Sequence, residues 1–84
     1  MKIPVVFRVI NDELLAIFPT MTNRSDWSVE CCSDKEGWCS CQDEYARKGR
    51  LATPEEYIPF LKWLNSGKDN TDFVVRKRLV FQWD

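Results

Sequence analysis

Residues 3–18, IPVVFRVINDELLAIF, set two apolar runs on either side of a short polar link. Both runs are rich in β-branched and aromatic residues, which favour strands. Asn11 and Asp12 between them tolerate the positive φ angles of a tight two-residue turn. The stretch therefore predicts a β-hairpin with strands at 3–10 and 14–18, the second ended by Pro19.

The two strands of this hairpin are apolar on both of their faces. Val5 and Phe7 alternate with Val6 and Ile10 in the first run, and the second run is apolar throughout 14–18. Because a single helix covers only one face of a sheet, something else must cover the opposite face. The sequence offers two candidates for that role, the segment 33–52 and a second copy of the chain in a homodimer.

Further strands are expected on both sides of a long loop. Trp27, Val29 and Cys31 alternate with polar residues, which predicts a third strand at 27–32. Residues 33–52 are charged and lack apolar periodicity, so we expect a long, ordered or semi-ordered loop there, with one helical turn at 42–47.

The strongest local signal marks the start of a helix. Thr53, Pro54 and Glu56 give an N-cap, a first-turn proline and a capping-box glutamate in their preferred order, and Gly67 is a natural stop. The apolar stripe of this helix is expected to consist of Ile58, Leu61 and Leu64, with Tyr57 beside them. A turn at 68–71 and a last strand at 72–83 complete the chain, with Lys77 breaking the apolar parity of that strand. The sequence predicts one α+β domain over residues 1–84, with a small antiparallel sheet in the order βββαβ packed against one helix.

Composition narrows the classes of function. Twelve Lys and Arg residues nearly cancel 13 Asp and Glu residues over 84 residues, so no global positive field favours nucleic acid, and direct nucleic-acid binding is not expected. No apolar run approaches a membrane span of about 20 residues, and the first residues lack the features of a secretory signal. We therefore expect a cytoplasmic protein whose thiols are kept reduced, with no membrane partner.

Four cysteines provide the main chemical signature of the chain, which has no histidine. Thiolates can hold zinc in a tetrahedral site, and a small domain gains folding energy from such a site. The spacing is unlike that of zinc knuckles, and adjacent residues of a regular strand point to opposite faces. A zinc site, a disulfide and free thiols all remain open for Cys31, Cys32, Cys39 and Cys41.

Acidic residues are concentrated in and around the predicted loop. Such a patch could imitate a nucleic-acid backbone and occupy a basic groove on a partner, or it could simply be a solvated loop. Trp38 lies within this loop and is a reasonable interface anchor, whereas Trp27, Trp63 and Trp83 fall in predicted elements and are expected in the core. The candidate partner-binding residues are Asp34, Glu36, Trp38, Asp43 and Glu44.

Basic residues form a second candidate surface. Three cations in a row occur in the last predicted strand, and further ones occur near positions 8 and 47–50. They could contact phosphates, or they could be solvent-exposed charges that protect a sheet edge. The residues concerned are Arg76, Lys77 and Arg78, with Arg8, Arg47, Lys48 and Arg50 elsewhere.

Three segments together carry a family resemblance: KIPVVFR at 2–8, LAIFP at 15–19 and LATPEEY at 51–57. In this order and spacing they resemble a family of small uncharacterised bacterial and mobile-element proteins that begin KIPVxFR and have a downstream LATxEEY helix start. The resemblance implies no established activity. Members carry histidines where this chain has Glu36 and Ser40.

The sequence thus favours a small non-enzymatic interaction protein. No P-loop, nucleophile elbow or histidine-based metal motif is present. The first hypothesis is an inhibitor or interaction protein, of phage or mobile-element origin, that docks on a larger protein or nucleoprotein complex through the acidic loop and an exposed sheet face. The second is a structural-zinc domain with four cysteine ligands that contacts nucleic acid through Arg76, Lys77 and Arg78. No other cofactor is expected.

Overall fold

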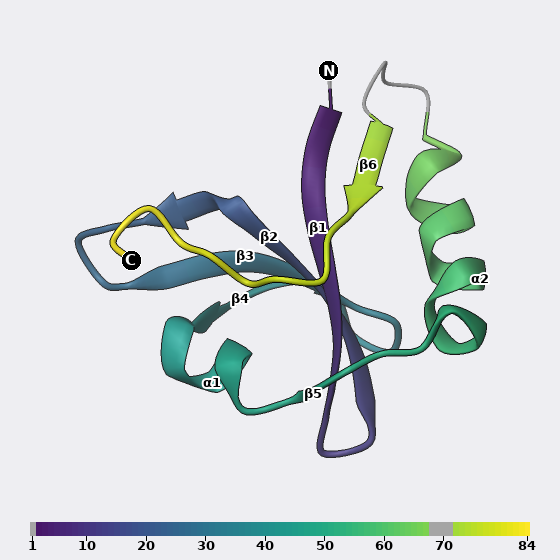
Figure 1. Ribbon diagram of the computed structural model, residues 1–84, viewed down its shortest axis with the longest axis horizontal. Coiled ribbons are helices and arrows are strands. Elements are labelled where there is room, and N and C mark those ends of the chain that lie inside the picture. The colour runs from purple at the N-terminus through teal and green to yellow at the C-terminus, as the bar shows by residue number, and fades with distance from the viewer. Residues whose placement is uncertain (1, 68–71) are drawn as a thin grey trace.

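A computed structural model of the chain describes residues 2–67 and 72–84 and shows a mixed α+β fold that is mostly sheet (Figure 1). The predicted turn at 68–71 lies outside the described residues. The predicted βββαβ order with a single helix is wrong, because the described residues form six strands and two helices. The elements in chain order are β1 (Lys2–Ile10), β2 (Glu13–Asn23), β3 (Ser28–Ser33), β4 (Gly37–Gln42), α1 (Asp43–Arg47), β5 (Arg50–Leu51), α2 (Pro54–Asn65) and β6 (Asp72–Val75).

The predicted hairpin is confirmed as β1 and β2. Asn11 and Asp12 have φ angles of 52° and 63°, which are the left-handed values that a tight two-residue turn needs. The prediction that β2 ends at Pro19 is wrong, since the strand continues to Asn23. Its pairing with β3 shifts register between Ile17 and Thr22. Proline cannot donate to the ladder, so an irregularity at this point accommodates Pro19 without ending the strand.

The 33–52 segment is ordered, and the prediction of a long loop there is wrong. β3 and β4 form a second antiparallel hairpin, in which Ser33 pairs with Gly37 and Gly37 takes a φ of 84°. The short helix α1 follows at the position where one helical turn was expected. The sequence signal of β4 was weak because this edge strand alternates half-buried cysteines with exposed residues, so it contains no strongly apolar face.

The strands are arranged in the order β4-β3-β2-β1-β5, and β6 also pairs with β1, in parallel. The carbonyl of Val5 accepts the N–H of Arg76, and the carbonyl of Phe7 accepts the N–H of Ala52. Carbonyls two residues apart on a strand point to the same edge, so β6 and β5 lie end to end along one edge of β1.

The last strand is much shorter than predicted, because the chain leaves the sheet after Val75, close to the parity break at Lys77.

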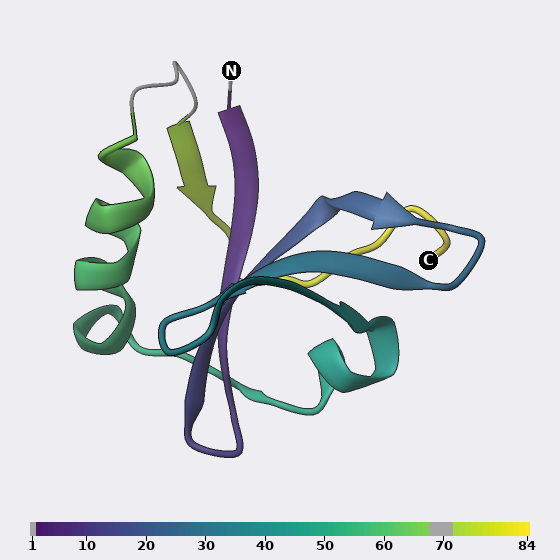
Figure 2. The same ribbon diagram turned by 180° about the vertical axis from the view of Figure 1, so that it is seen from behind.

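Two apolar clusters lie on opposite faces of the β1–β2 hairpin. On one face, Val5 and Phe7 pack with Phe60 and Leu64 of α2. The opposite cluster is completed by one residue of α1 and by the C-terminal segment, which crosses β1 on the near side in Figure 1 and on the far side in Figure 2. Its covering residues are Ala46, Leu79, Phe81 and Trp83. Part of the 33–52 segment therefore contributes to the second cover, as expected, together with a segment that the sequence assigned to a strand.

Polar contacts fix this C-terminal segment in place. Arg47 Nη2 lies 2.6 Å from Asp84 Oδ1, and the guanidinium carbon of Arg47 lies 4.8 Å from the centre of the Phe81 ring. The indole N–H of Trp83 donates to Asp43 Oδ2 over 3.1 Å. Both ends of α1 thus contact the segment, which holds its aromatic side chains over the sheet.

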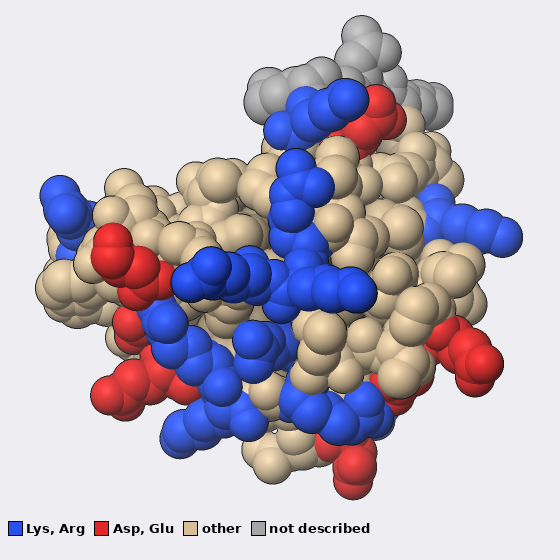
Figure 3. Space-filling model, viewed as in Figure 1, with Lys and Arg blue, Asp and Glu red and all other residues tan. Residues whose placement is uncertain are grey.

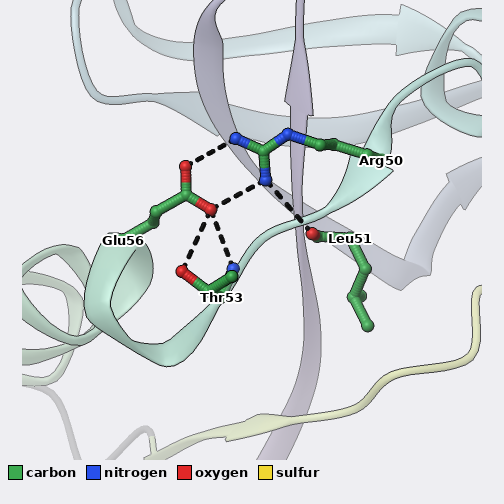
Figure 4. A network of polar contacts seen from close by, with 4 residues as sticks. All are labelled: Arg50, Leu51, Thr53 and Glu56. Atoms are coloured by element: carbon green, nitrogen blue, oxygen red, sulfur yellow. Dashed lines mark hydrogen bonds and ion pairs between the residues drawn. The ribbon is translucent and has the colours of Figure 1, made fainter.

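The predicted capping box of α2 is confirmed and is extended by an arginine from β5 (Figure 4). The backbone N–H and the hydroxyl of Thr53 both donate to Glu56 Oε1, over 2.9 and 3.1 Å. Arg50 forms a bidentate pair with the same carboxylate, over 2.8 and 2.7 Å. Since β5 is bound to β1, this network ties the start of α2 to the sheet.

This network generates a pH prediction. Hydrogen bonds from Arg50, then those from Thr53, lower the pKa of Glu56 from its ordinary 4.5 to about 2. A carboxyl whose pKa is lowered by folding stabilises the folded state above its unfolded pKa, and this contribution is lost as the pH falls from 4.5 towards 2. Between about pH 7 and about pH 3, we expect the melting temperature of the wild-type protein to fall by more than the melting temperature of the Glu56→Gln variant falls.

Glu55→Gln, in the same helical turn, is the matched control and should keep the wild-type pH dependence. Thermal melts followed by circular dichroism measure the difference. Equal pH dependence of wild type and Glu56→Gln would show that the network does not act on stability.

Candidate functional site

Three of the four cysteines lie together on one face of the β3–β4 hairpin. Cys31 is directly opposite Cys39 in the antiparallel register, and Val29 is opposite Cys41. The Sγ atoms of Cys31 and Cys39 are 3.0 Å apart. All three thiols border the cluster that the C-terminal segment covers, with Cys31 buried and the other two half-buried.

Cys32 lies on the opposite face, as strand alternation predicted. It is fully buried with Ala16 and Phe18 in the cluster beneath α2. One coordination sphere therefore cannot include all four thiolates, and the four-ligand set Cys31, Cys32, Cys39 and Cys41 is not assembled by this fold. Within residues 2–67 and 72–84, no group of three or more His, Cys, Asp or Glu side chains has the spacing to hold a metal ion.

The three clustered thiols are not equivalent. An interaction with Cys41, followed by burial and by hydrogen bonding with Cys39, raises the pKa of Cys31 far above its ordinary value. The same interaction lowers the pKa of Cys41. For Cys32, burial raises the pKa.

The candidate partner-binding residues do not form one patch. Asp34 and Glu36 lie in the turn between β3 and β4, whereas Asp43 and Glu44 begin α1 at the far end of β4. A six-residue strand spans about 20 Å, so the two acidic pairs are well separated.

Trp38 does lie at an exposed position, on β4. Its side chain is 57% exposed and stacks on Phe18 with ring centres 5.4 Å apart. It lines a groove with a volume of about 430 Å³ between α2 and the sheet. We call this the aromatic groove, and its apolar lining residues are Ile3, Met21, Trp38, Trp63, Leu64 and Phe73.

Trp63 forms the facing side of the aromatic groove, so its predicted place in the core is wrong. It is also 57% exposed, because the buried face of α2 is formed by Phe60 and Leu64. Ile58, expected on the apolar stripe, is exposed as well. The helix is rotated relative to the predicted stripe, since Phe60 at the stripe's edge packs 5.8 Å from the ring of Phe7.

A second hollow, with a volume of about 420 Å³, lies on the other side of Trp63. It is bounded by Pro59 and Phe60 of α2 and by Ser33, Asp34 and Gly37 of the β3–β4 turn. Trp63 thus lines both the aromatic groove and a hollow that Asp34 and Glu56 also line. The arrangement suits an extended ligand that has an apolar side chain followed by a basic one.

Basic side chains gather on the face shown in Figure 3, in a band over β1, the segment after β6 and the region of α1. Lys2 and Arg8 share one side of β1, and Arg76 is held beside that strand by its bond to Val5. Ion pairs among the described residues involve only Arg47, with Asp84, and Arg50, with Glu56. We call this surface the basic face, and the cations that belong to the segments it covers are Lys2, Arg8, Arg47, Lys48, Arg76, Lys77 and Arg78.

All of these cations except Lys2 were predicted from the sequence as possible phosphate contacts, but the sequence could not show that they lie near one another, since they are spread over residues 2–78. The parallel pairing of β6 with β1 brings them together. Positive and negative charges nearly cancel over the whole chain, but on this face the positive charges outweigh the negative ones.

Comparison of the chain with protein-family models, with curated proteins and with solved structures gives no match. Over the described residues, no helix has both the length and the apolar character needed to cross a bilayer.

Proposed function

We propose that this protein is a small non-enzymatic interaction protein that docks on a larger protein through the aromatic groove. The observation that carries this proposal is the pair Trp38 and Trp63, both 57% exposed and both lining the same groove. Large exposed aromatic side chains gathered at one site are typical of protein-binding surfaces, where tryptophan is enriched among the residues that dominate affinity.

The two tryptophans are held in position before any partner binds. Trp38 stacks on Phe18, and Trp63 packs against Phe60 with ring centres 5.9 Å apart. Phe18 and Phe60 belong to the core. Side chains that are already ordered lose less conformational entropy on binding, so more of the contact energy contributes to affinity.

The occupant that we propose is an extended segment of the partner with an apolar anchor and a basic side chain beyond it. The anchor fits between the tryptophans, and the basic side chain reaches Asp34 in the adjoining hollow. Glu36, in the same turn, adds to the negative charge at this end. Charges at the rim of an interface mainly set orientation and association rate. The partner class remains a larger protein or a nucleoprotein complex.

Affinity capture with matched tryptophan variants tests the groove. We expect Trp38→Ala and Trp63→Ala each to weaken capture of one dominant partner by about 30-fold, the effect of losing ~2 kcal/mol at a central aromatic anchor. Trp27→Ala is the control, because Trp27 is 49% exposed but lies outside the groove, against Trp83. Asp34→Lys should weaken binding, whereas Glu44→Lys, at the exposed start of α1, should not.

The partner identified by mass spectrometry is then titrated in purified form by calorimetry. Binding that is unchanged in both groove variants would contradict the proposal. A concentration-dependent dimer seen by light scattering, and lost in the same variants, would make a second copy of the chain the occupant.

A second candidate function, contact with nucleic-acid phosphates, is favoured by the basic face. The expectation against such binding rested on the net charge of −1, but the fold separates the charges. Arg76, Lys77 and Arg78 are exposed, whereas the guanidinium of Arg8 is part-buried and donates to the carbonyl of Gly49 over 2.8 Å. Phosphate contact through the basic face does not depend on bound zinc. In this respect the candidate differs from the structural-zinc hypothesis.

Anisotropy of a fluorescent DNA duplex tests this second candidate. Wild type should bind at about 50 mM salt and weaken steeply towards about 200 mM, because bound cations release counterions. The double variant Lys77→Glu/Arg78→Glu should bind more weakly and with a smaller salt slope. Lys62→Glu on α2 is the control. No binding at low salt, or equal binding by all three proteins, would remove this candidate.

A further inference from the structure

We propose that Cys31 and Cys39 form a reversible disulfide across the β3–β4 hairpin. The proposal rests on the register and the sulfur geometry, and it is independent of the aromatic groove. The two residues are directly opposite each other in the antiparallel pair, and their Sγ atoms lie 3.0 Å apart.

The geometry requires little movement for a bond to form. Residues directly opposite each other on antiparallel strands have Cβ atoms about 4.5–5.5 Å apart. A disulfide needs Cβ atoms about 3.5–4.5 Å apart and sulfurs about 2.05 Å apart. The sulfurs of Cys31 and Cys39 therefore have to approach by about 1 Å, which small χ1 rotations and a slight closing of the strands can supply.

The two cysteines also differ in their exposure to solvent. Cys39 is half-buried on the edge strand β4, so it is the more exposed of the two cysteines. Cys31 is buried directly beside it and is placed to resolve a first adduct. Cys32 is fully buried on the opposite face and cannot reach either sulfur.

The reaction that we propose uses a low-molecular-weight disulfide, R–S–S–R, as the oxidant. The Cys39 thiolate attacks one sulfur of the reagent, so that a mixed disulfide forms and one R–S⁻ leaves. Cys31 Sγ then attacks Cys39 Sγ, which forms the Cys31–Cys39 bond and releases the second R–S⁻. The protons lost by the two cysteines go to the two leaving thiolates. The protein dithiol loses two electrons, and the reagent is reduced to two R–SH molecules.

The expected consequence is a covalent link between the edge strand and its neighbour. β3 is the strand to which β4 is paired, and Trp38 precedes Cys39 directly. A bond at this position fixes β4 against β3 beside Trp38.

Mass spectrometry of the full chain in a glutathione redox buffer tests the proposal. Reduced protein is equilibrated with oxidised and reduced glutathione, treated with an alkylating reagent and digested. We expect a peptide in which the two segments on either side of Lys35 are linked, with Cys32 and Cys41 alkylated. The double variant Cys32→Ser/Cys41→Ser, which keeps only the proposed pair, should still give this linked peptide.

Cys39→Ser should abolish the linked peptide, and its circular dichroism melt shows whether the fold is kept. Glutathione adducts that stay unresolved, a link that involves Cys32 or Cys41, or unmodified thiols at every glutathione ratio would each overturn the proposal. Because wild type alone can give these outcomes, the test does not depend on the folding of any variant.

Discussion

The fold depends on a β-hairpin that is buried on both of its faces. Val5 and Val6 are adjacent on β1 and both are fully buried, although their side chains point to opposite sides of the sheet. Complete burial of each such side chain stabilises the folded state by about 1.5–3 kcal/mol. The sheet gains this stabilisation on both of its faces only if a separate segment covers each face. Helix α2 is one cover, and the C-terminal segment with α1 is the other. The remaining features of the molecule follow from how these covers are placed.

Helix α2 packs on one part of its sheet face and leaves another part open. Phe60 and Leu64 cover the hairpin near β1, while Trp38 on β4 stays exposed beyond the helix. The aromatic groove is the boundary between these two parts. On the opposite face, the C-terminal segment packs against the three clustered thiols, and the chain reaches it by way of the exposed cations after β6. The groove, the thiol cluster and the basic face are therefore consequences of one packing arrangement.

The sequence predicted the parts of this fold that local chemistry controls. The hairpin turn at Asn11 and Asp12, the capping box at Thr53 and Glu56, and the opposite directions of Cys31 and Cys32 each depend on a few neighbouring residues. The need for a second cover also followed from the apolar pattern alone. These predictions succeeded because no distant contact competes with the local preference.

Features that depend on distant contacts could not be predicted in the same way. The strand β4 has little apolar character of its own, and pairing with β3 is what orders it. The segment after Val75 alternates like a strand, yet its aromatic residues gain more burial by crossing to the open face of the hairpin. The exposure of Trp63 follows from the rotation of α2, and the basic face follows from the parallel pairing of β6 with β1.

A direct measurement of the two-cover arrangement compares native-state hydrogen exchange of the full chain with that of a chain ending at Arg78. Loss of Leu79 and Phe81 removes about 2–5 kcal/mol for each core side chain from a total stability of only about 5–15 kcal/mol. We predict that amides of both β1 and β2 lose their protection together. Full protection of these amides in the shortened chain would contradict the account.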